Sequence, residues 1–280
     1  MALPTLMDLM RRSTDYLTQH GITNARRETE WIFAETLALT RMDLYTRFDM
    51  PLEDQQVDRL RQLVQRRGRR EPLAYVLGNQ AFGRLTLKVG PGVLVPRPET
   101  EELVEFVLAR FPATTHVRVL DVGTGSGAIA LGIKQARPTW EITATDASEE
   151  ALAFARANGE RLELAVHWAH GHLAQQQQGP FDLIVANLPY IGEGERAQCD
   201  PELAFEPQRA LFSGADGLDL IGELIADVSR LLTPTGEAMF EHGWTQSAAI
   251  SAIAQANGFT ATTICDLAGK DRFSHLTRAV

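Results

Sequence analysis

Between residues 6 and 70, apolar side chains recur every three or four positions. The clearest run consists of Val57, Leu60, Leu63 and Val64. Residues at this spacing lie on one face of a helix, so the pattern indicates amphipathic helices that each bury one side. We therefore expect a small all-helical domain over residues 1–76.

After Gly78 the spacing of apolar residues shortens to every second position. Apolar side chains alternate with polar or small ones at Phe82, Leu85, Leu87 and Val89. Gly90, Pro91 and Gly92 then form a turn signal ahead of residues 93–95, which are again apolar. The pattern predicts a β-hairpin linker over residues 77–98.

From residue 99 onward, short β-rich runs alternate with helical stretches. The expected strands are 117–122, 141–145, 181–186 and 237–241, and the expected helices lie near 126–136, 148–160, 217–231 and 245–256. This alternation is typical of an α/β fold with a mostly parallel sheet covered on both faces. Residues 260–265 and 273–278 have no helix between them, so we expect an antiparallel pair at the end of the sheet. In such sheets, ligands bind at the carboxyl ends of the strands.

The composition indicates a folded core and bears on the expected compartment. The 280 residues are 44% apolar and 22% charged, which is enough to bury a sizeable core. No apolar run approaches the roughly eighteen residues that a membrane span needs, and no basic segment followed by an apolar stretch opens the chain. Cys199 and Cys265 lie far apart, without a C-x-x-C pair. We expect a cytoplasmic monomer without disulfides or membrane contact.

The net charge of −9 is unevenly distributed. Residues 1–80 carry twelve Arg against eleven Asp or Glu, so the acidic excess lies in the rest of the chain. Proteins that follow a phosphate backbone normally carry the opposite sign, so nucleic acid is disfavoured as the main partner. The one basic cluster is Arg61, Arg66, Arg67, Arg69 and Arg70. We interpret it as a solvated helix face rather than a binding patch.

A glycine loop follows the first expected strand of the α/β part. The strand ends at Asp121 and Val122, and Gly123, Thr124, Gly125, Ser126 and Gly127 lead into the next helix. Glycines allow the backbone to turn sharply and to approach a ligand at a helix N-terminus, where free N–H groups point outward. The loop also satisfies a loose dinucleotide fingerprint, so a nicotinamide or flavin cofactor stays an alternative.

Two carboxylates favour S-adenosylmethionine as the ligand of this loop. Asp121 stands two residues before Gly123, where it could face the cationic amino acid end of the donor directly or through water. Asp146 ends the second strand, where a short carboxylate can accept hydrogen bonds from both ribose hydroxyls. A helix cap for the residues that begin at Ser148 is the alternative role of Asp146.

The strand at residues 181–186 ends in Asn187, Leu188, Pro189 and Tyr190. An amide or aromatic amine nitrogen has a delocalised lone pair, so an enzyme that methylates it must hold the NH₂ group in line with the methyl–sulfur bond. The side-chain oxygen of Asn187 and the carbonyl of Leu188 can each accept one N–H, while the Tyr190 ring can cover the flat amide and pack near the sulfonium. We predict Asn187 and Tyr190 as catalytic residues and the four together as the substrate site.

Together, the G-x-G-x-G loop and Asn-x-Pro-Tyr resemble the amino-methyltransferases, which act on DNA adenine, ribosomal RNA guanine or protein glutamine. The chain more narrowly resembles the release factor glutamine methyltransferase family, through residues 71–78 and residues 93–101, which contain the V-P-R-P-E-T-E run. Shorter matches lie at 206–207 with 210–211, 216–218, 241–243 and 269–272. The resemblance implies a small helical substrate-recognition domain and a Rossmann-like class I methyltransferase domain over residues 99–280. It also implies methyl transfer from S-adenosylmethionine, leaving S-adenosylhomocysteine, to the glutamine of the Gly-Gly-Gln loop of peptide-chain release factors, in translation termination.

Two positions depart from the family pattern. Leu188 replaces the usual first proline of Asn-Pro-Pro-Tyr, which predicts looser preorganisation of Asn187 with activity intact. Gly171 and His172 stand where relatives carry an acidic residue and Trp or Leu, so His172 is a weak candidate for the adenine contact. Together with Asn187, the predicted cofactor residues are Asp121, Gly123, Thr124, Gly125, Ser126, Gly127, Asp146 and His172.

Three alternatives remain at this point. His167, His170 and His172 lack a nearby Cys or carboxylate to complete a ligand set, so we predict no metal site. The same chemistry could act on an exocyclic amine of DNA or ribosomal RNA, which the acidic charge disfavours. A nucleotide-binding or scaffolding protein that has lost activity through Leu188 and Gly171 is disfavoured by the intact Asn187, Pro189 and Tyr190.

Overall fold

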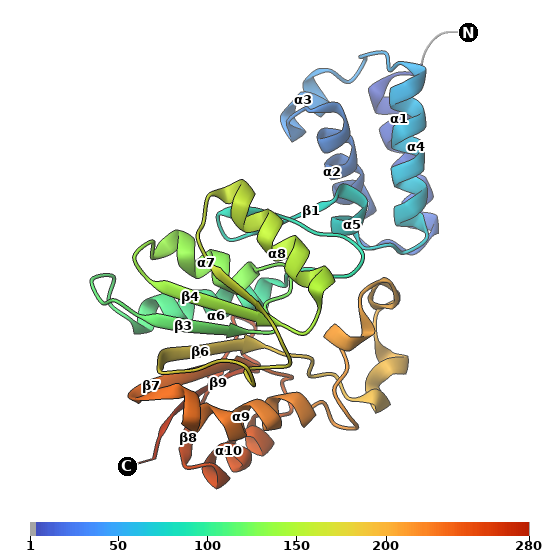
Figure 1. The fold of residues 1–280 in the computed structure, drawn as a ribbon. Coiled ribbons are helices and arrows are strands. Elements are labelled where there is room, and N and C mark those ends of the chain that lie inside the picture. The colour runs from blue at the N-terminus through green and yellow to red at the C-terminus, as the bar shows by residue number, and fades with distance from the viewer. Residues whose placement is uncertain (1–3, 280) are drawn as a thin grey trace. The chain divides into compact units, whose positions relative to one another are not determined.

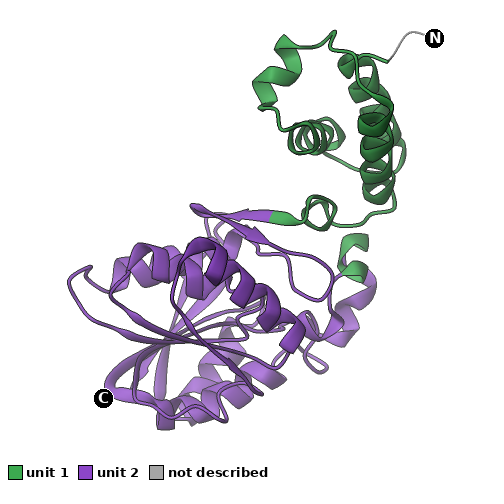
Figure 2. Cartoon of the chain, turned by 45° about the horizontal axis from the view of Figure 1, so that its top comes forward, with its two compact units in different colours: residues 1–79, 200–205 green, residues 80–199, 206–280 purple. Residues whose placement is uncertain are grey.

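The computed structural model describes residues 4–279 of the chain (Figure 1). These divide by their contacts into two compact units (Figure 2). One unit comprises residues 1–79 with 200–205, and the other comprises residues 80–199 with 206–280. The short segment 200–205 comes from within the α/β part of the sequence, so the division is not the simple linear one that we expected.

The first unit is helical, as the spacing of apolar residues predicted. Its helices are α1 (Leu6–Gln19), α2 (Ala25–Leu37), α3 (Arg41–Thr46), α4 (Asp54–Gly68) and α5 (Leu73–Leu77), joined by the short 3-10 helix η2 (Pro201–Phe205). Thr5 caps α1, and Thr40 and Asp43 form a reciprocal capping box on α3. Leu60, Leu63 and Val64 of the predicted run are buried in its core.

Arginines at the end of α4 form ion pairs inside the helical unit. Arg67 is only 6% exposed and donates to Glu28 and, at 3.0 Å, to Glu202. Arg70 donates to the other carboxylate oxygen of Glu202 at 2.8 Å. The interpretation of the whole cluster as a solvated face was therefore wrong for Arg67, which holds segment 200–205 in this unit.

The second unit begins with a two-stranded sheet of β1 (Asn79–Phe82) and β2 (Leu85–Lys88). Its two-residue connection contains Gly83, which has a φ of +55°. The hairpin turn therefore lies at residues 83–84. The predicted turn at residues 90–92 is also present, with the Val93 N–H donating to the Gly90 carbonyl at 3.3 Å, but it does not join two strands. Residues 93–97 form no strand and lead into α6 (Pro98–Arg110).

A seven-stranded sheet forms the centre of this unit, with the order β5-β4-β3-β6-β7-β9-β8 among the described residues. Its strands are β3 (Arg118–Val122), β4 (Glu141–Asp146), β5 (His167–His170), β6 (Phe181–Asn187), β7 (Leu232–Glu241), β8 (Phe259–Cys265) and β9 (Asp271–Arg278). Strands β3 to β7 run parallel, and β9 pairs antiparallel with both β7 and β8. This confirms the predicted sheet with its antiparallel end.

Helices cover both faces of the sheet (Figure 1). They are α6, α7 (Ala128–Ala136) and α8 (Glu149–Leu162) on one face, and α9 (Asp219–Leu231) and α10 (Ser247–Ala256) on the other. Each face has its own apolar core. None of the helices between residues 4 and 279 is long and apolar enough to cross a membrane.

The strand register brings four chain segments to one edge of the sheet. Val122 pairs with Thr145 on one side and with Ala186 on the other, so β3, β4 and β6 end side by side. Asn187 pairs with Glu241 at the end of β7. The carboxyl edge therefore gathers the glycine loop and the polar residues that follow each strand.

Candidate active site

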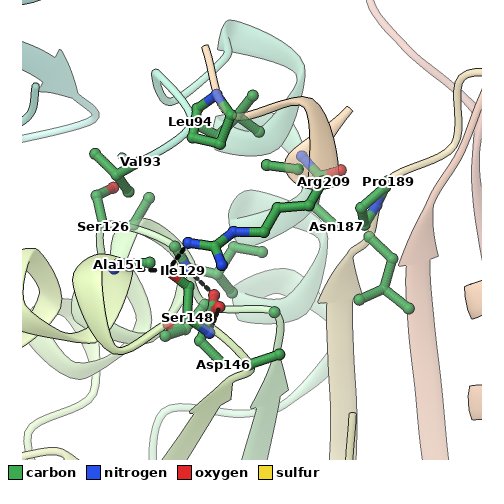
Figure 3. Close-up of a pocket in the computed structure, with 18 of the residues that line it drawn as sticks. Val93, Leu94, Ser126, Ile129, Asp146, Ser148, Ala151, Asn187, Pro189 and Arg209 are labelled. Atoms are coloured by element: carbon green, nitrogen blue, oxygen red, sulfur yellow. Dashed lines mark hydrogen bonds between the residues drawn. The ribbon is translucent and has the colours of Figure 1, made fainter. Parts of the chain in front are cut away.

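A cavity of about 280 Å³ opens at this edge of the sheet (Figure 3). Its lining residues come from segments 92–100, 123–129, 146–151, 172–173, 187–189 and 207–220. The glycine loop, Asp146 and Asn187 meet here, as the strand ends predicted. All of these segments belong to the second unit.

The glycine loop forms one wall of the cavity. A Cβ on Gly123, whose φ is +75°, would lie 2.8 Å from Cδ2 of Leu188. Gly127 precedes α7 with a φ of +84°, and a Cβ there would lie 3.0 Å from both Leu131 and Trp168. Gly123 thus allows close approach of the acceptor loop, whereas Gly127 allows packing of the helix behind the cavity.

Asp121 lies fully buried behind the loop and does not line the cavity. Its Oδ2 accepts hydrogen bonds from the Thr124 hydroxyl at 2.6 Å and the Ala130 N–H at 3.1 Å. Its Oδ1 is buried without a hydrogen-bond partner. Burial raises the pKa of Asp121 to about 7, against the lowering effect of the two hydrogen bonds. The carboxylate braces the turn, and its contact with the donor stays a prediction.

Asp146 lines the cavity and is held by two backbone donors. Its Oδ2 accepts from the N–H of Gly125 at 2.9 Å and its Oδ1 from the N–H of Ser148 at 2.8 Å. Ser148, and not Asp146, is the N-cap of α8, because its hydroxyl accepts from Ala151. Burial raises the pKa of Asp146, while the two backbone hydrogen bonds oppose that change. The carboxylate is therefore preorganised and faces the cavity.

Arg209 reaches across the cavity mouth toward the same region (Figure 3). Its Nη2 donates to the Ser148 hydroxyl at 2.5 Å. The backbone that carries Arg209 is anchored through Glu206, which accepts from the Val95 N–H at 2.9 Å and from Arg97 at 2.6 Å. Our sequence reasoning did not assign a role to Arg209, because no local motif marks it.

The acceptor motif forms the opposite wall. Asn187, Leu188 and Pro189 line the cavity. The Asn187 Nδ2 donates to the Thr100 hydroxyl at 2.9 Å. The Nδ2 can only donate, so the Oδ1 of the same amide is the atom that can accept a hydrogen bond.

Tyr190 does not belong to the described residues that line the cavity. Its hydroxyl donates to Glu241 at 3.3 Å. Burial raises the pKa of the Tyr190 hydroxyl well above its usual value, so it stays a donor at neutral pH. Its predicted stacking on the substrate amide stays a prediction.

Thr124, Ser126 and His172, which were also predicted, all line the cavity. His172 is exposed, and its Nε2 lies 3.1 Å from Glu223. His170, by contrast, contacts the carbonyl of Ala147. Within residues 4–279, no group of three His, Cys, Asp or Glu side chains is arranged to hold a metal ion.

Comparison with known proteins identifies the family. Residues 8–78 match the model of the PrmC N-terminal domain, and residues 100–216 match that of the methyltransferase small domain. A release factor glutamine methyltransferase of Deinococcus radiodurans is 36% identical over 274 residues, covering 98% of this chain and 99% of that protein. One of Neisseria gonorrhoeae is 42% identical over 237 residues, covering 83% and 86%.

A solved methyltransferase structure from Pyrococcus furiosus shares the fold, with a TM-score of 0.55, 21% identity, and coverage of 71% of this chain and 92% of that one. The near full-length identity to the curated relatives goes further than the fold. This chain belongs to the release factor glutamine methyltransferase family.

Proposed function

We propose that this protein transfers a methyl group from S-adenosylmethionine to the side-chain amide nitrogen of the glutamine in the Gly-Gly-Gln loop of a peptide-chain release factor. The observation that carries the proposal is the Asn187 amide, whose Nδ2 is tied to Thr100 at the cavity wall. Its oxygen is thereby available for an N–H of the substrate amide. The curated relatives carry the same activity in their names.

The opposite wall fits the donor. Asp146 offers a half-buried carboxylate to a pair of hydroxyls, and Gly123 and Gly125 line the cavity without side chains. The unpartnered Oδ1 of Asp121 suits a cationic group, reached directly or through water. When bound, S-adenosylmethionine supplies a methyl group activated by a sulfonium.

Residues of this chain orient the substrate amide. Asn187 Oδ1 and the Leu188 carbonyl accept the two N–H bonds of the substrate amide and so direct its nitrogen toward the donor. Both residues belong to the wall that faces the glycine loop. The methylated amide nitrogen then becomes acidic enough to lose its extra proton to water, and no side-chain base is required.

Substitution of Asn187 tests the proposal. In Asn187→Ala, label transfer from methyl-labelled donor to purified release factor should fall at least 100-fold, because the acceptor loses its oriented partner. Donor affinity measured by calorimetry should stay nearly unchanged. Parallel incubations contain total RNA and DNA, and mass spectrometry locates the labelled residue. Label on nucleic acid instead of the release factor glutamine would contradict the proposed substrate.

We assign recognition of the release factor outside its glutamine loop to the helical unit. Met42 and Phe48 of this unit are 72% and 54% exposed and offer apolar surface to a partner. Replacing both by Ser should raise KM for intact release factor but not for a short Gly-Gly-Gln peptide. An equal effect on both substrates, or on neither, would remove this assignment.

A further inference from the structure

Glu241 is a buried carboxylate that the proposed mechanism leaves without a role. It ends β7 as the register partner of Asn187 and is only 1% exposed. Its Oε2 accepts from the Thr100 hydroxyl at 2.7 Å, and its Oε1 accepts from the Tyr190 hydroxyl at 3.3 Å. A carboxylate without solvent is costly, so its position needs a reason beyond packing.

Thr100 connects this carboxylate to the acceptor site. A hydroxyl has a single proton, and Thr100 gives its proton to Glu241. Toward Asn187 it can then only accept, and it does so from Nδ2 at 2.9 Å. The anion thus sets the direction of two successive hydrogen bonds, and an amide with its Nδ2 on Thr100 must present its Oδ1 on the other side.

We propose that Glu241 is a positioning residue, which acts through Thr100 to hold the Asn187 amide with its oxygen toward the substrate nitrogen. It also acts through Tyr190, whose hydroxyl is held at the same carboxylate. The inference rests on the proposed function, since the direction of the amide matters only for an acceptor that brings N–H groups.

Charge around Glu241 bears on its protonation. Burial raises the pKa of Glu241 to about 7; Arg272 on β9 lowers it, and the neighbouring Glu99 on α6 raises it. Tyr190, with Arg97 also facing it, stays protonated because burial raises its pKa. Protonated Glu241 can donate to Thr100, whose proton then turns to Asn187 and favours the reversed amide. Turnover at saturating donor should therefore fall below about pH 7.

The two successive hydrogen bonds from Asn187 to Thr100 and from Thr100 to Glu241 form a relay. Two substitutions test it: one reverses its direction and the other breaks it. Glu241→Gln keeps the shape but offers an NH₂ group to Thr100, and should lower kcat roughly 10- to 100-fold, the cost of one misdirected buried hydrogen bond. It should also abolish the fall in kcat below pH 7. Thr100→Val should lower kcat similarly, while Thr100→Ser, which keeps the hydroxyl, should restore it. Donor affinity by calorimetry should change less than threefold in Glu241→Gln.

Glu237 provides the matched control on the same strand. It is 6% exposed and bound by His275 at 2.8 Å and by Arg110, away from Thr100. Glu237→Gln therefore removes a buried carboxylate of β7 without touching the relay. Glu237→Gln should keep both kcat and the pH dependence of kcat. A loss of activity in Glu241→Gln alone would then reflect the direction of the Asn187 amide and not a general loss of stability.

A readout without substrate separates this inference from the proposed function. The side-chain amide resonances of Asn187 in NMR spectra should titrate with a midpoint near that of Glu241, and should not titrate in Glu241→Gln. A wild-type protein that leaves release factor unlabelled would overturn the proposed function, and the resonances would still decide the relay. An unchanged kcat and pH profile in Glu241→Gln, or equal activity of Thr100→Val and Thr100→Ser, would overturn the relay.

Discussion

Replacing Asp121 by Asn separates its structural role from its predicted role at the donor. The Asn side-chain oxygen can take the place of Oδ2 and accept from both Thr124 and Ala130, as the carboxylate does at 2.6 and 3.1 Å. The brace of the glycine loop is then kept. The substitution removes the charge and puts an NH₂ group in place of the unpartnered Oδ1, an exchange that does not vary with pH.

The magnitude follows from the pKa of Asp121, which burial raises from 3.8 to about 7. At about 1.36 kcal/mol per pKa unit, the ionised carboxylate destabilises the native state by about 4 kcal/mol relative to the protonated one. Below about pH 4 both native and unfolded chains are protonated at this site, and the cost is absent. As pH rises from about 4 to 7, the unfolded chain loses the proton first, so the native state loses stability.

The assay is urea denaturation of wild type and Asp121→Asn between pH 4 and 8. The variant should gain up to about 4 kcal/mol in the free energy of unfolding relative to wild type across that range. Glu241, whose pKa is also raised to about 7, is present in both proteins and cancels in the difference. A difference independent of pH would refute the buried-charge reasoning.

Donor binding tests the second role of Asp121. At pH 8 the variant should bind donor at least tenfold more weakly; unchanged affinity would mean that Asp121 only stabilises the glycine loop.

Three further substitutions test the cavity walls. Asp146→Ala should weaken donor binding roughly 100-fold in calorimetry, since two charge-assisted hydrogen bonds are lost, and a larger effect on kcat than on binding would contradict this role. Gly123→Ala should destabilise by about 2–4 kcal/mol in urea, combining a left-handed backbone with a clash against Leu188, and a loss below 1 kcal/mol would show that Leu188 moves freely. Leu188→Pro should keep kcat within about threefold, because the backbone carbonyl remains, although thermal stability should drop with the lost packing.

The fold was largely predictable because its signals are local. The strands at 117–122, 141–145 and 181–186 were placed within one residue of β3, β4 and β6. Strand β7 begins at Leu232, five residues before the predicted start, because residues 233–236 carry no β-rich pattern. The hairpin was placed around residues 90–92 because the alternation of apolar residues continues past β2. That turn forms, but residues 93–97 pair with no strand.

The residues of the site were likewise predictable where a local signal marks them, and were missed where they meet only in the folded protein. Asp146 and Asn187 are the last residues of β4 and β6, so the rule that parallel strands end at one edge was sufficient to bring them together. Thr100 and Glu241 are 141 residues apart and meet only through the packing of α6 on the sheet. The ion pair of Arg67 with Glu202, 135 residues apart, was not predicted for the same reason. No period or local motif encodes such contacts.

Folding stability and the proposed function require opposite protonation states of the buried carboxylates Asp121 and Glu241. Burial raises the pKa of Asp121 and of Glu241 to about 7, so both favour the folded state most when protonated, at lower pH. Their proposed work requires the ionised forms, because only an anion attracts the donor's cation and only an acceptor fixes the direction of the Thr100 hydroxyl. The contribution of these groups to stability should therefore decline over the pH range in which turnover rises. Glu241→Gln tests this directly, since it should stabilise the fold at pH 8 while it lowers kcat.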